Sequence, residues 1–217
     1  MREHAAMTTG APDLGFAHRY EPGEGPTLLL LHGTGADEND LIPFGRAVAP
    51  GAALLSPRGQ VLENGMPRFF RRLAMGVFDV DDLKRRTADL GRFVEAAGAH
   101  YGFAGSDVIA VGYSNGANIA ASLLLSEPGR VGAAALLHAM VPFRADPLPD
   151  LSGTQVLMTG GANDPMIPRD QTEELARMLS DAGAGVRLEL APGGHELTTA
   201  EVEKVRDWIA GLPRDAA

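Results

Sequence analysis

The stretch from Val108 to Ile119 reads Val-Ile-Ala-Val-Gly-Tyr-Ser-Asn-Gly-Ala-Asn-Ile. Its first four residues are continuously apolar, which is typical of a strand covered on both faces. A Gly-x-Ser-x-Gly turn centred on Ser114 follows, and the residues after it favour a helix. A tight turn from strand to helix holds a serine hydroxyl exposed, so Ser114 is a candidate nucleophile. The motif alone is weak evidence, because glycine is abundant in this chain and the serine of such a turn can be inert.

The same alternation of strands and helices is predicted along the rest of the chain. Short apolar runs bounded by glycine, proline or aspartate predict buried strands at 27–31, 52–55, 133–137, 155–158 and 187–190. Apolar positions with a period near 3.6 predict a long helix at 79–101, and further helices are expected at 41–48, 116–125, 169–182 and 198–210. Residues 16–20 are expected to add an antiparallel edge strand. This alternation predicts an α/β fold, with a mainly parallel sheet and helices on both faces.

Length and composition fit one domain. The 217 residues carry 28 acidic and 19 basic side chains, a formal net charge of -9, and no cysteine. A chain of this size buries enough surface to fold without a covalent staple. The absence of cysteine excludes disulfides, cysteine-based metal sites and a cysteine nucleophile. Residues 1–14 are predicted to form a flexible tail, and residues 15–217 a single domain.

Charge and hydropathy exclude some classes of partner. The basic side chains are scattered over a net negative chain, so the electrostatic footprint of a nucleic-acid binder is missing. No apolar run reaches the ~18 residues of a membrane span, and no apolar segment typical of a secretory signal follows Arg2. We therefore expect a cytoplasmic protein that acts on a small molecule, without nucleic acid or a membrane span. Its oligomeric state stays open, a homodimer included.

A reactive serine needs a base, and the base needs a carboxylate that orients it. His195 lies in a glycine-rich loop after the last predicted strand, and Asp164 follows the strand predicted at 155–158. Both should lie at the carboxyl edge of the sheet, where ligands bind in such folds. The chain order Ser114, Asp164, His195 is the order of α/β-hydrolases. His4, His18 and His100 are expected to face solvent, and the alternative for His195 is a loop histidine without a role.

Acyl transfer also needs two N–H donors for the oxyanion that develops on the substrate. Asn115 follows the nucleophile and offers the first backbone N–H. Thr34, in the His-Gly-Thr-Gly turn after the strand predicted at 27–31, is the best candidate for the second, with Gly35 as the alternative. His32 in this turn is interpreted as a buried residue that shapes the loop, in preference to a catalyst.

The loop after the strand predicted at 52–55 is unusually apolar. Its Met66, Phe69 and Phe70 can form a wall for an acyl or aromatic group, and the equally weighted alternative is that such side chains pack beneath the loop. Met140 and His138, just past the strand predicted at 133–137, are also placed to line the site. Only residues 142–153 are available for a cap, so we expect no large cap domain and an open site.

Five segments together resemble the phospholipase/carboxylesterase family of small α/β-hydrolases. They are Leu-Leu-His-Gly-Thr-Gly-Ala-Asp-Glu at 30–38, Ser-Pro-Arg-Gly at 56–59, Gly-Tyr-Ser-Asn-Gly-Ala-Asn at 112–118, Asn-Asp-Pro-Met-Ile-Pro at 163–168 and Gly-Gly-His-Glu-Leu at 193–197. The family includes acyl-protein thioesterases, lysophospholipases and bacterial carboxylesterases, and the bacterial branch is the most similar. The resemblance spans residues 27–210. It implies a triad of Ser114, Asp164 and His195, with oxyanion donors at Thr34 and Asn115.

The implied activity is that of a serine carboxylesterase, which cleaves small soluble esters through an acyl-enzyme without a cofactor or metal. Lysophospholipase and acyl-protein thioesterase are the alternatives within the family. Acyl-protein thioesterases typically carry Gln after the nucleophile, so Asn115 argues against protein deacylation. Outside the family, the rivals are a catalytically silent binding protein and a metal-dependent hydrolase using His32, His138 and His195. These histidines lack close ligand spacing, which disfavours the metal site.

Overall fold

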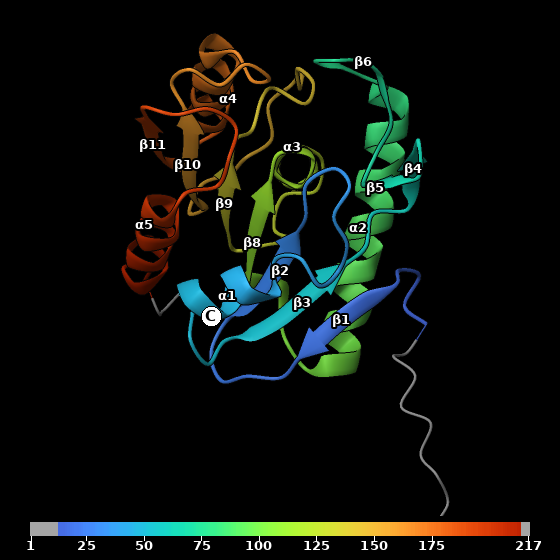
Figure 1. Ribbon diagram of the computed structural model, residues 1–217. Helices are drawn as coiled ribbons and strands as arrows, with labels where there is room; N and C mark the ends of the chain where they lie inside the picture. Colours follow the sequence, from blue (N-terminus) through green and yellow to red (C-terminus); the bar gives the residue numbers. More distant parts are fainter. Residues whose placement is uncertain (1–12, 214–217) are drawn as a thin grey trace, which may run out of the picture.

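The computed structural model describes residues 13–213 (Figure 1). Seven strands form one sheet in the order β1-β3-β2-β8-β9-β10-β11. All neighbours in it are parallel except β1, which pairs antiparallel with β3 at the edge. The strands are β1 (His18–Glu21), β2 (Thr27–Leu31), β3 (Ala53–Pro57), β8 (Val108–Tyr113), β9 (Ala133–Leu137), β10 (Gln155–Gly161) and β11 (Gly185–Ala191). The predicted parallel sheet and its antiparallel edge strand are confirmed.

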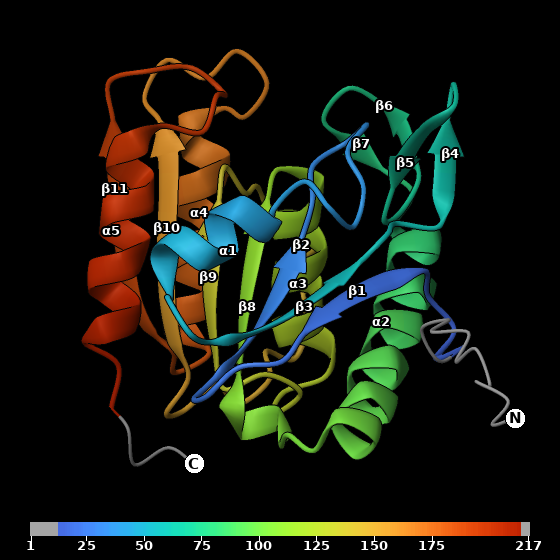
Figure 2. The same ribbon diagram turned by 60° about the horizontal axis from the view of Figure 1, so that its bottom comes forward.

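Helices cover both faces of this sheet, as Figures 1 and 2 show. The helices are α1 (Ile42–Val48), α2 (Val80–Tyr101), α3 (Asn115–Ser126), α4 (Arg169–Asp181) and α5 (Thr199–Ala210), with a short 3-10 turn at Gly105–Asp107. Along β2, Leu28 and Leu30 belong to the apolar core on the side of α1 and α5, whereas Leu29 and Leu31 belong to the core on the side of α2, α3 and α4. The strands are apolar on both sides because both faces of the sheet are covered.

The segment between β3 and α2 folds into two small hairpins instead of the predicted loop. The strand pairs are β4 (Val61–Glu63) with β5 (Met66–Arg68), and β6 (Arg72–Ala74) with β7 (Val77–Phe78). The first hairpin turns at Asn64 and Gly65, whose φ angles are 52° and 81°. An Asn-Gly pair is the preferred sequence for a two-residue hairpin with positive φ at both positions, so this signal was readable in the sequence. The strands were missed because each is only two or three residues long.

Two predictions about the N-terminal part of the chain have different outcomes. His18 is only 9% exposed, because its Nδ1 contacts Phe16 O at 2.8 Å and its Nε2 contacts Tyr101 Oη at 2.8 Å. The expectation that His18 faces solvent was therefore wrong. His4 and residues 1–12 of the predicted tail lie outside the described residues, so that prediction stays untested. No helix in the described part of the chain is long and apolar enough to cross a membrane.

Candidate active site

Ser114 occupies a strained turn between β8 and α3. Its φ and ψ are 53° and -113°, a conformation that non-glycine residues adopt rarely and mostly at functional sites. The flanking glycines are required by space: a Cβ on Gly116 would lie 1.9 Å from Leu31 O, and one on Gly112 would lie 2.5 Å from Gly116 O. The Ser114 N–H donates to Leu137 O at 2.9 Å, which ties the turn to β9.

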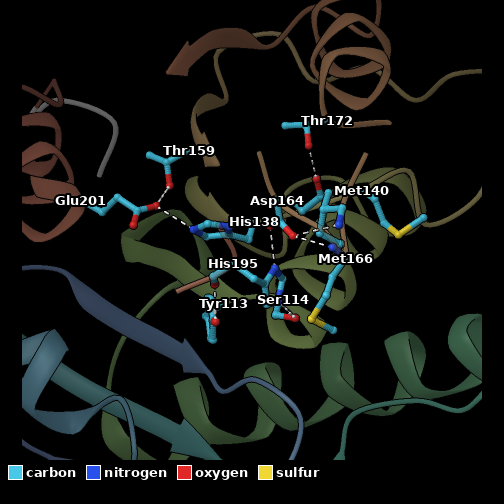
Figure 3. A network of polar contacts seen from close by, with 12 residues as sticks. Tyr113, Ser114, His138, Met140, Thr159, Asp164, Met166, Thr172, His195 and Glu201 are labelled. Atoms are coloured by element: carbon cyan, nitrogen blue, oxygen red, sulfur yellow. Dashed lines mark hydrogen bonds and ion pairs between the residues drawn. The ribbon is translucent and has the colours of Figure 1, made fainter. Parts of the chain in front are cut away.

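A continuous row of hydrogen bonds joins Ser114, His195 and Asp164 (Figure 3). His195 Nε2 lies 2.9 Å from Ser114 Oγ, and His195 Nδ1 lies 2.7 Å from Asp164 Oδ2. Asp164 Oδ1 accepts from the backbone N–H groups of Met166 at 2.8 Å and Ile167 at 3.0 Å. Burial alone would raise the pKa of Asp164, but bonds from two histidines and two backbone N–H groups outweigh burial and lower it. Asp164 is therefore a carboxylate.

The loop that carries His195 folds back over the end of β10. Asn163 N–H donates to Gly193 O at 3.0 Å, and a Cβ on Gly161 would lie 2.1 Å from Gly194 O. This close approach requires glycine at the end of β10, at position 161. From the other side, Tyr113 Oη donates to His195 O at 2.6 Å. Burial, together with nearby carboxylates, raises the pKa of Tyr113 to about 12, so the phenol keeps its proton and remains a donor.

The two N–H groups expected to bind an oxyanion are free of protein acceptors. Among residues 13–213, the backbone N–H groups of Thr34 and Asn115 have no hydrogen-bond acceptor, whereas the Gly35 N–H donates to Pro67 O at 3.0 Å. Gly35, the alternative donor, is thus already engaged. The Asn115 N–H also lies in the first turn of α3, where the helix dipole favours negative charge.

The hairpin formed by β4 and β5 holds both candidate donors in place. Arg68 Nη1 donates to Thr34 Oγ1 at 2.9 Å, and the Phe69 N–H donates to Asn115 Oδ1 at 2.7 Å. Arg68 is 3% exposed and pairs with Glu63 at 3.2 Å, and burial lowers the pKa of its guanidinium. The segment predicted to be a wall therefore reaches the site through its backbone and Arg68.

The predicted wall needs a correction at Phe69 and Phe70. Their exposed fractions are 1% and 0%, because the Phe69 ring packs 4.7 Å from the His32 ring and the Phe70 ring packs 5.0 Å from the Phe78 ring. Both rings belong to the core and cannot touch a substrate in this conformation. Met66, by contrast, is 41% exposed and lies over the turn at Gly35, 3.6 Å from the point where a Cβ would stand.

Two methionines, Met140 and Met166, lie near Asp164 (Figure 3). Met140 is 7% exposed and its N–H donates to Asn118 Oδ1 at 2.9 Å, so little of its side chain is available as a wall. Met166 follows Asp164, is 36% exposed, and in Figure 3 extends from the Asp164 turn toward Ser114. Met166 lies in the segment 163–168, one of the five that resemble the phospholipase/carboxylesterase family, but it was not predicted to line the site. Its exposure makes it a better candidate than Met140 for contact with a substrate.

His32 is wholly buried with both ring nitrogens bound to backbone. Nδ1 lies 2.7 Å from Gly33 O, and Nε2 accepts from the Gly59 N–H at 2.9 Å. Burial lowers the pKa of His32, so the ring is neutral and fixed in one tautomer. It shapes the turn that presents Thr34 and takes no part in a metal site.

His138 lies behind the site and not on a pocket wall. It is 2% exposed, with Nδ1 3.0 Å from Asp164 Oδ2 and Nε2 3.1 Å from Glu201 Oε1. Placing it with the lining residues was therefore wrong. Glu201 was not predicted to lie near the site at all. The Thr-x-x-Glu pattern at Thr198 does indicate a helix start, and Glu201 caps α5, but nothing local to it reports the contact with His138.

His138, Asp164 and His195 together could present ligand atoms to a metal ion, since one atom from each lies within 4.8 Å of the others. The sequence spacing carried no sign of this cluster. Both Nδ1 atoms approach the same oxygen, Asp164 Oδ2, at hydrogen-bond distances. That arrangement suits two N–H donors on one carboxylate. A metal would require both nitrogens without protons, although His138 sits between two carboxylates that favour its protonated form.

A cavity of about 730 Å³ lies far from this cluster. Its lining includes Pro26, Ile109, Ala133 and Gln155, which begin or precede strands, whereas the candidate triad follows strands. The cavity is thus at the amino edge of the sheet, opposite the edge where ligands bind in folds of this type. It has no contact with the candidate triad.

Comparison with known proteins identifies the family of this chain. A family model described as Phospholipase/Carboxylesterase matches residues 20–212. "Putative hydrolase MhqD" of Bacillus subtilis (strain 168) is 50% identical over 192 residues, which cover 88% of this chain and 96% of that protein.

Two solved structures share the fold and much of the sequence. The Bacillus cereus carboxylesterase superposes with a TM-score of 0.89 at 46% identity, over 91% of this chain and 95% of that chain. The carboxylesterase from Mesorhizobium loti gives a TM-score of 0.83 at 35% identity, over 88% of this chain and 91% of that chain. This protein belongs to the phospholipase/carboxylesterase family of α/β-hydrolases, and it is an ester hydrolase.

Proposed function

We propose that the protein is a serine carboxylesterase that cleaves small soluble carboxylic esters through an acyl-enzyme on Ser114. The observation that carries the proposal is the unbroken row Ser114 Oγ, His195 Nε2, His195 Nδ1 and Asp164 Oδ2, with steps of 2.9 and 2.7 Å. Each distance is within the reach needed for proton transfer or for orienting the base. The strained Ser114 backbone supports the same assignment, because it keeps the hydroxyl at the surface of the turn.

In the proposed mechanism, Ser114 Oγ attacks the ester carbonyl carbon while His195 Nε2 takes the hydroxyl proton. The backbone N–H groups of Thr34 and Asn115 bind the oxyanion of the tetrahedral intermediate. Collapse of that intermediate breaks the bond to the alcohol oxygen, which receives the proton from His195. A water molecule, activated by the same nitrogen, then attacks the acyl-enzyme and releases the carboxylic acid. Asp164 stays ionised throughout and fixes the tautomer and orientation of His195.

The proposed substrate is a short ester because the two methionines placed beside the site are partly exposed. Met66 and Met166 are 41% and 36% exposed, so each can cover a few methylene groups of an acyl chain. Each methylene that is covered contributes up to ~0.8 kcal/mol. Chains of about two to six carbons should gain from this contact, and longer chains should extend into water and gain nothing more.

Labelling the nucleophile tests the mechanism. An organophosphonate should add one adduct, which mass spectrometry locates on the peptide that contains Ser114, and Ser114→Ala should abolish turnover while the fold is retained. Ser106→Ala, at an exposed serine before β8, is the matched control and should keep full activity. Retained activity in the presence of a chelator would argue against a metal-dependent hydrolase. A label elsewhere, or an active Ser114→Ala variant, would refute the assignment.

A substrate panel tests the specificity. We propose p-nitrophenyl esters of increasing acyl length, together with oxygen esters and thioesters that share one acyl chain. Values of kcat/KM should rise to about six carbons and then level off. A preference that keeps rising to long chains would favour a lysophospholipase, and a strong preference for thioesters would favour an acyl-protein thioesterase. Either outcome would replace the short-ester specificity and leave the acyl-enzyme mechanism intact.

A further inference from the structure

Beside Asp164, a second histidine and a second carboxylate are buried in a row (Figure 3). His138 lies between Asp164 and Glu201, at 3.0 Å from Asp164 Oδ2 and 3.1 Å from Glu201 Oε1. The exposed fractions of the side chains of His138, Asp164 and Glu201 are 2%, 1% and 6%. Burying three titratable groups is costly unless their charges compensate each other. The charge state of this row therefore follows from its geometry.

Glu201 is ionised because donors surround its carboxylate. Oε1 accepts from Thr159 Oγ1 at 2.7 Å, and Oε2 accepts from the N–H and the hydroxyl of Thr198 at 2.9 and 3.0 Å. Burial alone would raise the pKa of Glu201. The nearby charge of His138 and the hydrogen bonds from Thr159 and Thr198 outweigh burial and lower this pKa to about 2. Because Asp164 is also a carboxylate, His138 has an anion at each ring nitrogen.

A neutral imidazole fits this position poorly. It carries one N–H and one unprotonated nitrogen, which would lie about 3 Å from a carboxylate oxygen in the interior. A doubly protonated ring donates Nδ1–H to Asp164 and places a positive charge beside Glu201, although the Nε2–H is not aligned for a hydrogen bond. Burial alone would lower the pKa of His138, but the hydrogen bonds and charges of Glu201 and Asp164 raise it above its usual value.

The other titratable groups around His138 do not alter this balance. Tyr113 from β8 approaches with its ring centroid at 5.8 Å and keeps its proton, as its raised pKa shows. His195, from the loop after β11, has its ring centroid at 5.1 Å, close enough to sense the charge of His138. The His138 backbone is held as well: its φ is 56° and its N–H donates to Thr159 O at 2.9 Å.

We infer that His138 and Glu201 are positioning residues, which act as a buried imidazolium–carboxylate pair that holds Asp164 and sets the pH above which His195 accepts the Ser114 proton. The inference rests on the proposed triad, because the pair acts through its acid. The pair has no net charge, so within this row the uncompensated negative charge beside His195 is that of Asp164. Removing the charge of His138 or of Glu201 alone should change the net charge of the row. Removing both charges should restore the net charge of the wild type.

The variant His138→Asn tests the charge of the pair. Its amide nitrogen can stand close to the position of Nδ1, and Asn tolerates a positive φ better than most residues, so the turn and a donor to Asp164 can be kept. Two carboxylates would then face His195 without a cation between them. The acid limb of the kcat/KM profile should move to higher pH by about one unit.

The double variant His138→Asn with Glu201→Gln is the decisive comparison. Gln at this position preserves the capping box of α5, so the local structure is matched. The row again carries one negative charge, and the acid limb should return most of the way to its wild-type position. A purely structural role would give no such reversal. An unmoved acid limb in His138→Asn, or a further upward move in the double variant, would overturn the inference.

A measurement without turnover tests the pair independently. In protein labelled with ¹⁵N-histidine, both ring nitrogens of His138 should show the shifts of protonated nitrogen at about pH 7, and the Glu201→Gln variant should lose that proton at a lower pH. A neutral His138 in the wild type would overturn the inference. If Ser114→Ala proved active, the proposed esterase mechanism would fail while this spectrum still tested the pair. If His138→Asn failed to fold, the spectra of the wild type and Glu201→Gln would decide.

Discussion

Two loops each bring a histidine to the same oxygen of Asp164, yet the two histidines differ in what they can do. His195, after β11, lies 2.7 Å from Oδ2, is 15% exposed, and directs its other nitrogen to Ser114 Oγ. His138, after β9, lies 3.0 Å from Oδ2, is 2% exposed, and directs its other nitrogen to Glu201. A hydroxyl can give up a proton to the ring, whereas a carboxylate keeps the ring protonated. Both histidines contact Asp164, so that contact does not distinguish them. The group at the second ring nitrogen and the degree of burial distinguish the candidate base from the positioning residue.

The hairpin segment shows the same division between exposed and buried side chains. Met66 and Phe70 both come from the apolar stretch before α2, but Met66 is 41% exposed and Phe70 is 0% exposed. Only the former can meet a substrate. The latter anchors a segment whose Arg68 and backbone hold the turn at Thr34 and the side chain of Asn115. Substitutions in the histidine cluster and in the segment before α2 test both differences.

Removing the acceptor that both histidines share should have the largest effect. Asp164→Asn should lower kcat about ten-thousandfold, because His195 loses the partner that fixes its tautomer. Hydrolysis of p-nitrophenyl butyrate measures the loss, and circular dichroism checks that the fold is retained. A variant with an unchanged rate would mean that the acid of the reaction lies elsewhere.

Truncating Phe70, which is buried between the two hairpins, should affect stability rather than specificity. Phe70→Ala should lower the free energy of unfolding by about 3–5 kcal/mol, as is usual for a fully buried phenylalanine. Urea unfolding measures the loss, and Leu62→Ala, at a residue 69% exposed in the nearby β4–β5 hairpin, is the control that should change little. Any loss of kcat/KM should be equal for acetate and butyrate esters. A loss confined to butyrate would place Phe70 in the substrate pocket after all.

Glu201 should make stability depend on pH in a predictable direction. Its folded pKa of about 2 lies below the usual 4.5, so its charge contributes stability that is present above pH 4.5 and lost as the pH falls toward 2. Glu201→Gln should cost on the order of 2–3 kcal/mol near neutrality, and the gap from the wild type should close through this acid window. The raised pKa of His138 limits the contribution of the pair at high pH. As the pH rises through the pKa of His138, the ring loses its charge and the ion pair with Glu201 weakens.

Urea unfolding of both proteins at several pH values gives these differences. Glu203→Gln, at an exposed glutamate on the same helix, removes one charge without touching the pair and should show no such window. A gap between wild type and Glu201→Gln that stayed constant down to pH 2 would contradict the assignment of a depressed pKa to Glu201.

The smallest effect is expected at the exposed methionine. Met66→Ala should lower kcat/KM for butyrate a few-fold more than for acetate, since the two extra methylenes lose up to ~0.8 kcal/mol of contact each. Thermal unfolding should change little, because the side chain is only partly buried. Steady-state kinetics on the two p-nitrophenyl esters is sufficient. Equal losses for both esters would remove Met66 from the acyl-binding surface.

The sheet, its helices and the chain order of the candidate triad could be predicted from local patterns in the amino-acid sequence. Apolar strands, the helical period and the Gly-x-Ser-x-Gly turn are local patterns, and each of Ser114, Asp164 and His195 could be placed after a strand. Since parallel strands end at one edge of a sheet, that placement was enough to expect the three side chains together, and the structure brings them within hydrogen-bond distance. Their catalytic roles stay a prediction for the experiments above.

The neighbours that surround these residues depend on how segments far apart in the chain pack together. Whether Phe69 and Phe70 line a pocket or pack in the core depends on how the hairpin lies against His32 and Phe78, which no local pattern encodes. The pairing of His138 with Glu201 likewise joins the end of β9 to the first turn of α5, two segments far apart in the chain. Burial and charge compensation arise from such long-range contacts, so these features appear only once strand order and helix packing are fixed.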